Sequence, residues 1–275
     1  MLNPPLSLLS DDLLVSIVEQ LAKLPFADEN LNNLSLADRA FTESCQKFIF
    51  RKIILGNGRN ISKQLKRMKR LLDDKPSFAN RVRMVQLSMS LKGSRLVTKD
   101  PNFASILQLL AKSPMPPHEL HLGGLLNPSS FIEDLMPVTR QLAESFFSQT
   151  LTILRVGEYV NVPLPLFLIC PRLSEVILEQ VGANDKSFEY PVNQCSGREA
   201  PLLEVFDYSS SHDLIEQMIT PPPPFNTPVV LWSNLRVLTL VPYDIKGMAC
   251  LQPILDAAFS TLEELYLTSM TTSST

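Results

Sequence analysis

The segment Leu235-Arg-Val-Leu-Thr-Leu240 carries the pattern that decides the fold, because its leucine spacing returns twenty-seven residues later as Leu262-Glu-Glu-Leu-Tyr-Leu267. Between the two, apolar residues from Met248 to Phe259 recur three and four positions apart, which predicts a helix. Side chains two residues apart in a strand point to one face, so the last two leucines of each pattern face the same side. One such unit cannot bury that face alone and must stack on copies of itself.

The same spacing recurs from Val82 onward and predicts seven strands. Their first positions are 22 to 35 residues apart, and most of the intervals hold a helical pattern. In the fifth strand two registers are open, one with Leu202, Val205 and Asp207 facing inward and one shifted by a single residue. The seven patterns are Val82/Val85/Leu87, Pro117/Leu120/Leu122, Leu151/Leu154/Val156, Leu173/Val176/Leu178, Leu202/Val205/Asp207 or Leu203/Phe206/Tyr208, Leu235/Leu238/Leu240 and Leu262/Leu265/Leu267.

This array resembles irregular leucine-rich repeats, whose units run about 20 to 29 residues. The resemblance implies an α/β fold over residues 81–275, a solenoid of strand-helix repeats with about seven strands. An open α/β domain is the alternative fold. Only a short polar segment follows the last pattern, so we expect the C-terminal end to lack a cap and to be incomplete or to depend on a partner.

Residues 4–55 predict a compact helical module. Ser10 is followed by two aspartates, an N-cap with an acidic first turn, and an apolar stripe then continues to Leu21 before Pro25. A second apolar helix is predicted from Leu31 through Phe41. A helical hairpin that caps the array is one interpretation of this module.

The order of these pieces also resembles the F-box over about fifty residues. The matching stretches run from Leu9 through Leu21 and from Leu34 through Phe41, although Ser10 stands where the family usually has proline. The resemblance implies docking onto the Skp adaptor of a cullin-RING ubiquitin ligase. The adaptor-binding residues that it implies are Leu9, Leu13, Leu14, Ile17, Leu21, Leu31 and Leu34.

Positive charge is concentrated after this module. From Arg51 to Arg83 there are eleven basic residues and two acidic ones, whereas the rest of the chain has 14 basic and 26 acidic residues. Apolar residues recur three or four apart within this stretch, so residues 56–80 predict a basic linker helix with one apolar stripe. A nuclear-localisation or phosphate-contacting role is the alternative, although no aromatic side chain interleaves to stack on bases.

Composition limits the function classes. A net charge of -3 and a pI near 5.7 argue against a general nucleic-acid or acidic-membrane binder. The four cysteines form no C-x-x-C pair, which suits reduced thiols. No basic flank precedes the first apolar residues and no apolar run approaches about 20 residues. We therefore expect a cytoplasmic or nuclear protein that does not engage a membrane.

No catalytic constellation has the required spacing. His118 and His121 are three apart rather than the four that the zinc-protease helix motif requires. There is no Gly-rich phosphate loop and no nucleophile elbow. We therefore expect a non-enzymatic protein without a cofactor or a bound metal.

The residues beside the inward leucines should point outward along the concave face. Glutamates and aromatic residues dominate that row, which favours a basic partner segment anchored by aromatic contacts; a solvated sheet face is the alternative. The substrate-binding residues predicted there are Glu119, Glu175, Ile177, Glu179, Glu204, Phe206, Tyr208 and Tyr266.

Together these features predict a substrate-recognition subunit of an SCF-type ubiquitin ligase. The N-terminal module would hold the adaptor, the repeats would hold an unknown and possibly basic protein substrate, and the ligase chemistry would belong to other subunits. The alternative is a non-catalytic leucine-rich-repeat scaffold or interaction module without ligase association. A third hypothesis, nucleic-acid binding by the basic helix, predicts affinity that falls steeply with rising salt.

Overall fold

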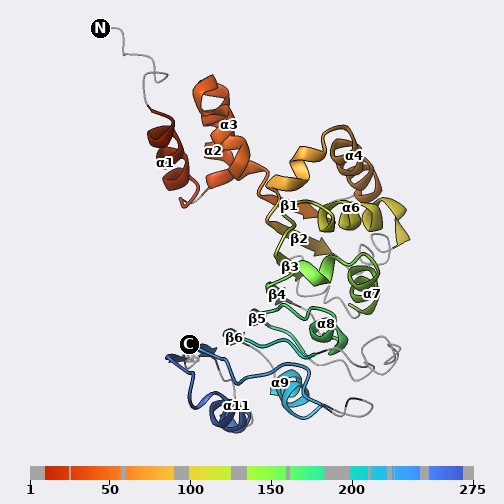
Figure 1. Cartoon of the computed structure of the whole chain (residues 1–275), viewed down its shortest axis with the longest axis vertical. Helices are drawn as coiled ribbons and strands as arrows, with labels where there is room; N and C mark the ends of the chain where they lie inside the picture. Colours follow the sequence, from red (N-terminus) through yellow and green to blue (C-terminus); the bar gives the residue numbers. More distant parts are fainter. Residues whose placement is uncertain are drawn as a thin grey trace, which may run out of the picture.

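The structure is a computed structural model that describes residues 10–24, 26–56, 60–89, 99–124, 135–158, 162–182, 199–209, 212–221, 225, 227–241 and 248–268. It is an α/β protein built on one eight-stranded parallel sheet, whose strands follow one another in chain order (Figure 1). The strands are β1 (Lys52–Leu55), β2 (Met84–Met89), β3 (Glu119–Gly124), β4 (Ile153–Gly157), β5 (Glu175–Glu179), β6 (Val205–Ser209), β7 (Val237–Leu240) and β8 (Glu264–Leu267).

Helices or 3-10 turns connect most successive strands and lie along the outer side of the curved array, while the strands line its inner side (Figure 1). Between β5 and β6 the described residues hold no helix. Ahead of β1 stand α1 (Asp11–Leu21), α2 (Ala27–Ala37), the 3-10 turn η2 (Arg39–Phe41) and α3 (Thr42–Ile49). The outer helices are α4 (Ile61–Asp74), η3 (Pro76–Arg81), α6 (Pro101–Ala111), α7 (Met136–Glu144), η4 (Phe147–Thr150), α8 (Pro165–Leu168), α9 (His212–Ile219) and α11 (Leu251–Ala258).

A repeated hydrogen-bond pattern fixes where each strand begins. One backbone carbonyl near the start of a strand accepts two N–H groups from the start of the next, at 2.7 to 3.2 Å, and this occurs at all seven junctions between β1 and β8. Each entering strand is therefore held in the same register on its predecessor. The seven accepting carbonyls belong to Arg51, Arg83, His118, Thr152, Ser174, Glu204 and Arg236.

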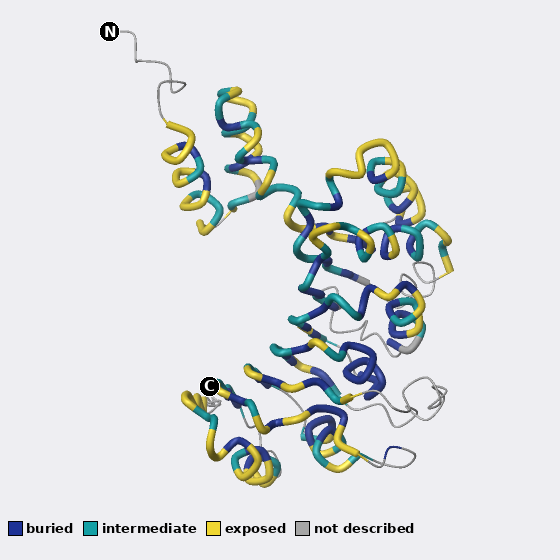
Figure 2. Tube along the Cα trace, viewed as in Figure 1, coloured by how far each residue is buried: buried dark blue, intermediate teal, exposed yellow. Residues whose placement is uncertain are grey.

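The core lies between the sheet and the outer helices (Figure 2). Five of the seven predicted leucine patterns are confirmed, because their last two residues pair in register across the sheet and are buried. The fifth pattern takes the shifted register, with Phe206 and Tyr208 buried and Asp207 on the inner face, so the Leu202/Val205/Asp207 register is wrong. The ring of Phe206 packs edge-on against Trp232, with centroids 5.0 Å apart.

The sheet has eight strands rather than the expected seven. The additional strand is β1, which pairs in parallel with β2 and buries Ile53 and Leu55. Its residues were expected to close the helical module. The strand joins the sheet because its two apolar residues alternate with exposed ones, so the buried pair completes the first core layer.

The basic helix α4 packs into the same continuous core as the repeats. Its residues Ile61, Leu65 and Leu72 are buried, and Met68 packs against them. The segment expected to be a linker is thus the outer helix between β1 and β2.

The helices α1 to α3 have a small core of their own. Leu14, Val18, Leu31, Phe41 and Cys45 are buried together, separately from the main core. Burial raises the pKa of the Cys45 thiol above its ordinary value. The second helix begins at Ala27, four residues earlier than expected, and ends at Ala37.

Among the described residues, a ring contact and a side-chain hydrogen bond join this small bundle to the array. The rings of Phe50 and Phe78 lie 4.7 Å apart, and Arg81 donates a hydrogen bond of 3.4 Å to Gln46. The guanidinium of Arg81 also lies over the Phe78 ring.

The last strand differs from the others in its burial. Leu265 and Leu267 pair in register with β7 but are 43% and 49% exposed, whereas the equivalent Leu238 and Leu240 are buried. Within the residues described above, no helix combines the length and the apolarity needed to cross a bilayer.

Candidate functional site

The inner face of the sheet presents two rows of outward side chains, which the strand register places side by side. Adjacent strands lie about 4.8 Å apart, so neighbours in a row are within reach of one another. The first row is Lys52, Met84, Glu119, Ile153, Glu175, Val205, Val237 and Glu264. The second row is Ile54, Gln86, His121, Arg155, Ile177, Asp207, Thr239 and Tyr266.

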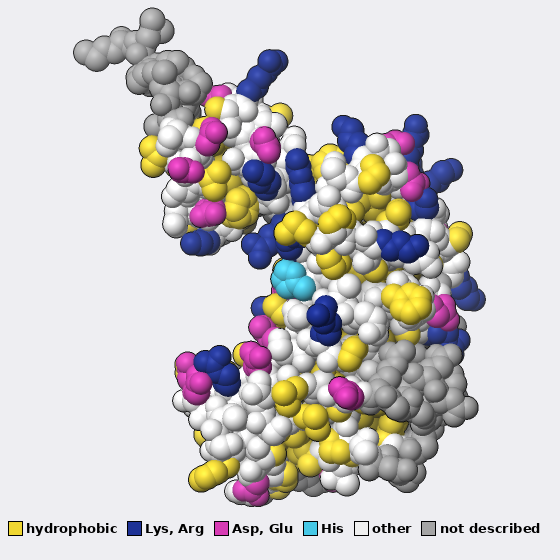
Figure 3. Space-filling view, viewed as in Figure 1, with side chains coloured by type: hydrophobic (Ala, Val, Ile, Leu, Met, Phe, Trp, Pro, Cys, Tyr) yellow, Lys and Arg dark blue, Asp and Glu magenta, His cyan; other side chains and the backbone are white. Residues whose placement is uncertain are grey.

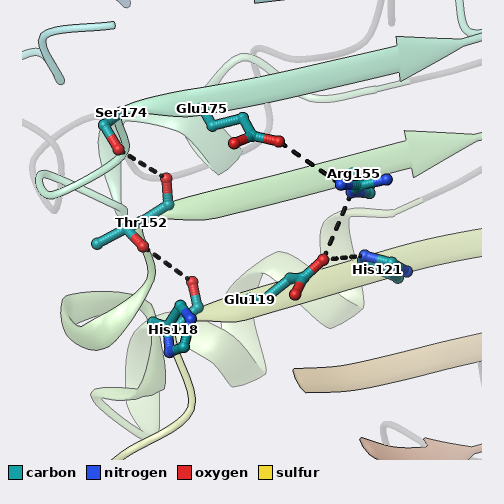
Figure 4. Close-up of polar contacts among 7 residues, drawn as sticks. All are labelled: His118, Glu119, His121, Thr152, Arg155, Ser174 and Glu175. Atoms are coloured by element: carbon teal, nitrogen blue, oxygen red, sulfur yellow. Dashed lines mark hydrogen bonds and ion pairs between the residues drawn. The ribbon is translucent and has the colours of Figure 1, made fainter. Parts of the chain in front are cut away.

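Arg155 is the centre of a charged cluster in the middle of these rows (Figure 4). Its Nε lies 3.5 Å from Oε1 of Glu119, and its Nη2 lies 3.6 Å from Oε1 of Glu175. The two glutamates flank Ile153 in the first row, so the arginine reaches back from the second row to both. One cation therefore offsets part of the charge of two carboxylates that were expected to attract a basic partner.

His121 completes this cluster by holding Glu119. Its Nε2 lies 2.6 Å from the Glu119 carboxylate. Burial lowers the pKa of His121 below its ordinary value, and the nearby Arg155 and Lys52 charges lower it further, although Glu119 opposes them. The lowered pKa favours the neutral imidazole at pH 7. Because a carboxylate only accepts hydrogen bonds, Nε2 carries the proton and donates it.

Further negative charge lies on the next strands. Asp207 stands beside Ile177 in the second row, and Glu179 lies two residues further along β5. Burial raises the pKa of the Asp207 carboxyl, the Glu179 charge raises it further, and Arg155 lowers it. A partner cation placed between Asp207 and Glu179 would relieve this repulsion. The exposed Glu204 lies just before β6.

The predicted substrate residues are therefore only partly on the inner face. Glu175, Ile177, Glu179 and Tyr266 are there, and the Tyr266 hydroxyl donates a hydrogen bond to Glu264. Glu119 also lies there, but it is buried in the cluster with His121 and Arg155. Phe206 and Tyr208 are corrected to core residues, because the shifted register of β6 turns them toward the helices.

Two residues that the prediction omitted are central to this surface. Asp207 faces inward in one of the two registers left open for its strand, and Arg155 was not among the predicted substrate-binding residues. The alternation Leu203/Phe206/Tyr208, with large apolar residues two apart, is the sequence signal that places Asp207 outside.

The helical bundle carries a second candidate surface on α1. Leu13 and Ile17 are 53% and 43% exposed, whereas Leu14 and Val18 on the adjoining face are buried. Leu21 and Leu34 are partly buried, and Leu31 is buried in the bundle core. Leu9 lies outside the described residues. The predicted adaptor face thus divides into two exposed residues and others that hold the bundle together.

Further exposed apolar residues lie on the same bundle. Leu24 and Leu36 are exposed, and Phe26 is 81% exposed with a left-handed backbone (φ 60°). That conformation is costly for a bulky residue. Figure 3 shows hydrophobic side chains at the surface of this part of the molecule.

A cavity of 410 Å³ lies between α9 and α11. His212, Glu216 and Cys250 line it together with Ile219 and Pro253. No group of three or more His, Cys, Asp or Glu side chains within the described ranges is arranged to hold a metal ion.

The inner face displays charged residues together with half-buried apolar residues. The α1 surface displays an exposed leucine and an exposed isoleucine on a short helix. Surfaces of these two kinds can bind other polypeptides. Comparison with known proteins adds no assignment, since no protein-family model matches the chain and no curated protein matches it significantly.

Proposed function

We propose that this chain is a substrate-recognition subunit of an SCF-type cullin-RING ubiquitin ligase. In this proposal the bundle of α1 to α3 is an F-box-like module that docks onto the Skp adaptor. The strand-helix array is an irregular leucine-rich-repeat solenoid that holds the protein to be ubiquitinated. The chain itself carries no ligase chemistry, which belongs to other subunits.

The observation that carries the proposal is the division of apolar residues on α1. Leu14 and Val18 are buried in the bundle, whereas Leu13 and Ile17 on the adjoining face are exposed, so the bundle core does not account for these two residues. Exposed large apolar side chains close together on one helix are typical of a protein-interaction site. These two residues are four apart and therefore share one helix face.

The curvature of the sheet supports the second half of the proposal. A solenoid presents a concave surface whose outward side chains come from every repeat, which is how repeat proteins bind extended partners. Here the central cluster of Glu119, His121 and Arg155 separates a more basic end, with Lys52, from a more acidic end with Glu179 and Asp207. A partner segment with its basic end toward β5 and β6 would match this distribution.

The decisive experiment is co-purification of the full chain with the Skp adaptor. Wild-type chain should retain the adaptor, and Leu13→Asp with Ile17→Asp should not. Glu19→Lys, an equally large charge change at an exposed position on another side of α1, is the matched control and should retain it. Failure of the wild-type chain to bind the adaptor would contradict the proposal.

A scaffold without ligase association is the second candidate. The ring contact of Phe50 with Phe78 and the hydrogen bond from Arg81 to Gln46 attach the bundle to the array, as expected of an N-terminal cap. A cap would be needed for folding of the array. Deleting residues 1–49 separates the two candidates: a docking module can be removed with little loss of cooperativity in β2 to β7, whereas a cap cannot.

A further inference from the structure

The outer face of α4 carries a row of cations that neither the fold nor the proposed function uses. Lys63, Lys66, Arg67 and Arg70 are exposed, and helical geometry places them on one side, opposite the buried Ile61, Leu65 and Leu72. We call these four residues the α4 basic stripe. It is about 10 Å long, because its ends are seven residues apart at about 1.5 Å per residue.

The stripe is poorly neutralised within the chain. Arg70 lies 3.6 Å from Asp74, but both side chains are largely exposed, so the pair is weak. Among the residues that the structure describes, Lys63, Lys66 and Arg67 form no ion pair. Lys69, at the margin of the stripe, pairs with Asp73 at 2.5 Å. The carboxylates therefore lie only at the C-terminal end of the helix.

The position of α4 leaves this stripe accessible while the other surfaces are occupied. The helix lies on the outer side of the array, whereas the proposed substrate surface is on the inner side (Figure 1). Lys and Arg side chains project around this end of the array in Figure 3. Carrying several like charges side by side on one helix is unfavourable, since like charges three or four residues apart repel one another.

We infer that the α4 basic stripe docks an acidic polypeptide segment of a partner protein, with Asp or Glu side chains three or four residues apart. Cations on a helix at these spacings stand about 5 to 6 Å apart, and carboxylates at the same spacings on a partner helix match them. This contact is distinct from adaptor docking and does not depend on it.

An acidic polypeptide segment fits the α4 basic stripe better than a nucleic acid does. The stripe contains no aromatic side chain on which a base could stack. Four cations in about 10 Å reach few phosphates, whereas the rest of the molecule is acidic and repels a long polyanion. A short acidic segment meets the stripe without approaching the carboxylates of Glu179 and Asp207 on the opposite side of the array.

The test is fluorescence anisotropy of the full chain with a labelled alanine-based helical peptide that carries glutamates three and four residues apart. We expect binding at low salt that weakens as salt rises. Lys63→Glu with Lys66→Glu and Arg67→Glu should weaken binding by about 10-fold or more, because three attractive pairs become repulsive. The thermal unfolding temperature should not fall, since all three side chains are exposed and their mutual repulsion is removed.

A matched control carries the same charge change elsewhere. Lys112→Glu with Arg140→Glu and Arg172→Glu alters three exposed cations on separate parts of the chain and should change affinity less than about 2-fold at moderate salt. Equal weakening in both triple variants, or no binding of the peptide to the wild-type chain, would overturn the inference. Tighter binding of a single-stranded oligonucleotide of equal charge, lost in the stripe variant, would overturn it in favour of nucleic acid. Adaptor co-purification should survive in the stripe variant, so this result and that of the proposed function are separable.

Discussion

Arg155 on β4 and Glu119 on β3 form an ion pair across the inner face of the sheet, with Nε 3.5 Å from Oε1. Because Arg155 also reaches Glu175, the middle of this face is less acidic than its two glutamates alone would make it. The acidic character that remains is displaced toward β5 and β6, where Glu179 and Asp207 have no equivalent cation within the described inner face. A basic partner segment would therefore bind off-centre.

Replacing Arg155 should shift the titration of its neighbour. The guanidinium lowers the pKa of His121, so Arg155→Met should raise that pKa, as measured by NMR titration of the imidazole. Stability should fall by only about 1 kcal/mol or less, because the arginine is partly exposed. Arg140→Met, an exposed position outside the cluster, is the control and should leave the His121 titration unchanged.

His121 should also make stability depend on pH. Its pKa is lower in the folded protein than its ordinary value of about 6.5, so the unfolded chain takes up the proton first as pH falls. The stabilising contribution is complete above about pH 6.5 and is lost as pH falls toward the folded pKa. Denaturant unfolding of wild type and His121→Asn from pH 8 to pH 5 should show a larger loss of stability in wild type than in the variant. Parallel pH curves for the two proteins would contradict the assignment.

The register of β6 predicts opposite outcomes for two aromatic residues that were both expected on the binding face. Phe206 is buried and packed on Trp232, so Phe206→Ala should cost about 3 to 5 kcal/mol of unfolding free energy. Tyr266 is exposed on the inner face, so Tyr266→Ala should cost less than about 1 kcal/mol. Chemical denaturation measures both, and similar costs would be incompatible with this register.

Leucine spacing predicted the strand-helix repeats because it reports burial directly. Inward positions such as Leu120 and Leu122 lie in the core, where a polar residue would be unfavourable. The same signal left two registers open at β6, because Leu202 and Leu203 are adjacent and either could begin the pattern; the structure has the one that begins at Leu203. It also missed β1, since Ile53 and Leu55 follow a helical segment without a leading leucine. A register shift of one residue moves every side chain of a strand to the other face. Apolar spacing marks the core face directly, whereas the residues of the binding face follow only from the register, so the core was more predictable than the binding face.

The surface of α1 was less predictable for a related reason. Helical periodicity groups Leu13, Leu14, Ile17 and Val18 into one broad apolar stripe, and only the position of α2 and α3 decides which part of the stripe is covered. The ion-pair partners of Arg155 likewise depend on which strands are neighbours, information that the spacing of one repeat does not contain.

The two halves of that stripe should respond differently to a charge. Leu14→Asp places a carboxylate in the bundle core and should unfold α1 to α3, since an unpaired buried charge is strongly destabilising. Leu13→Asp should leave the bundle folded and remove adaptor binding. Circular dichroism and limited proteolysis measure folding, and co-purification measures docking. Loss of folding in both variants would show that Leu13 is a core residue.

The exposed leucines of β8 give the last prediction. Leu240 and Leu267 occupy the same position in successive repeats, but Leu240 is buried and Leu267 is half exposed. Leu240→Ala should therefore cost about 2 to 5 kcal/mol, and Leu267→Ala less than about 1 kcal/mol, because only the buried side chain leaves a cavity. Backbone amides of β8 should exchange with solvent faster than those of β7, since an end repeat has a neighbour on one side only. The isolated chain should also self-associate as its concentration rises, through this uncovered apolar row. Slow exchange through Leu262 to Leu267 in a chain that stays monomeric would contradict the prediction and would mean that the row is covered in solution.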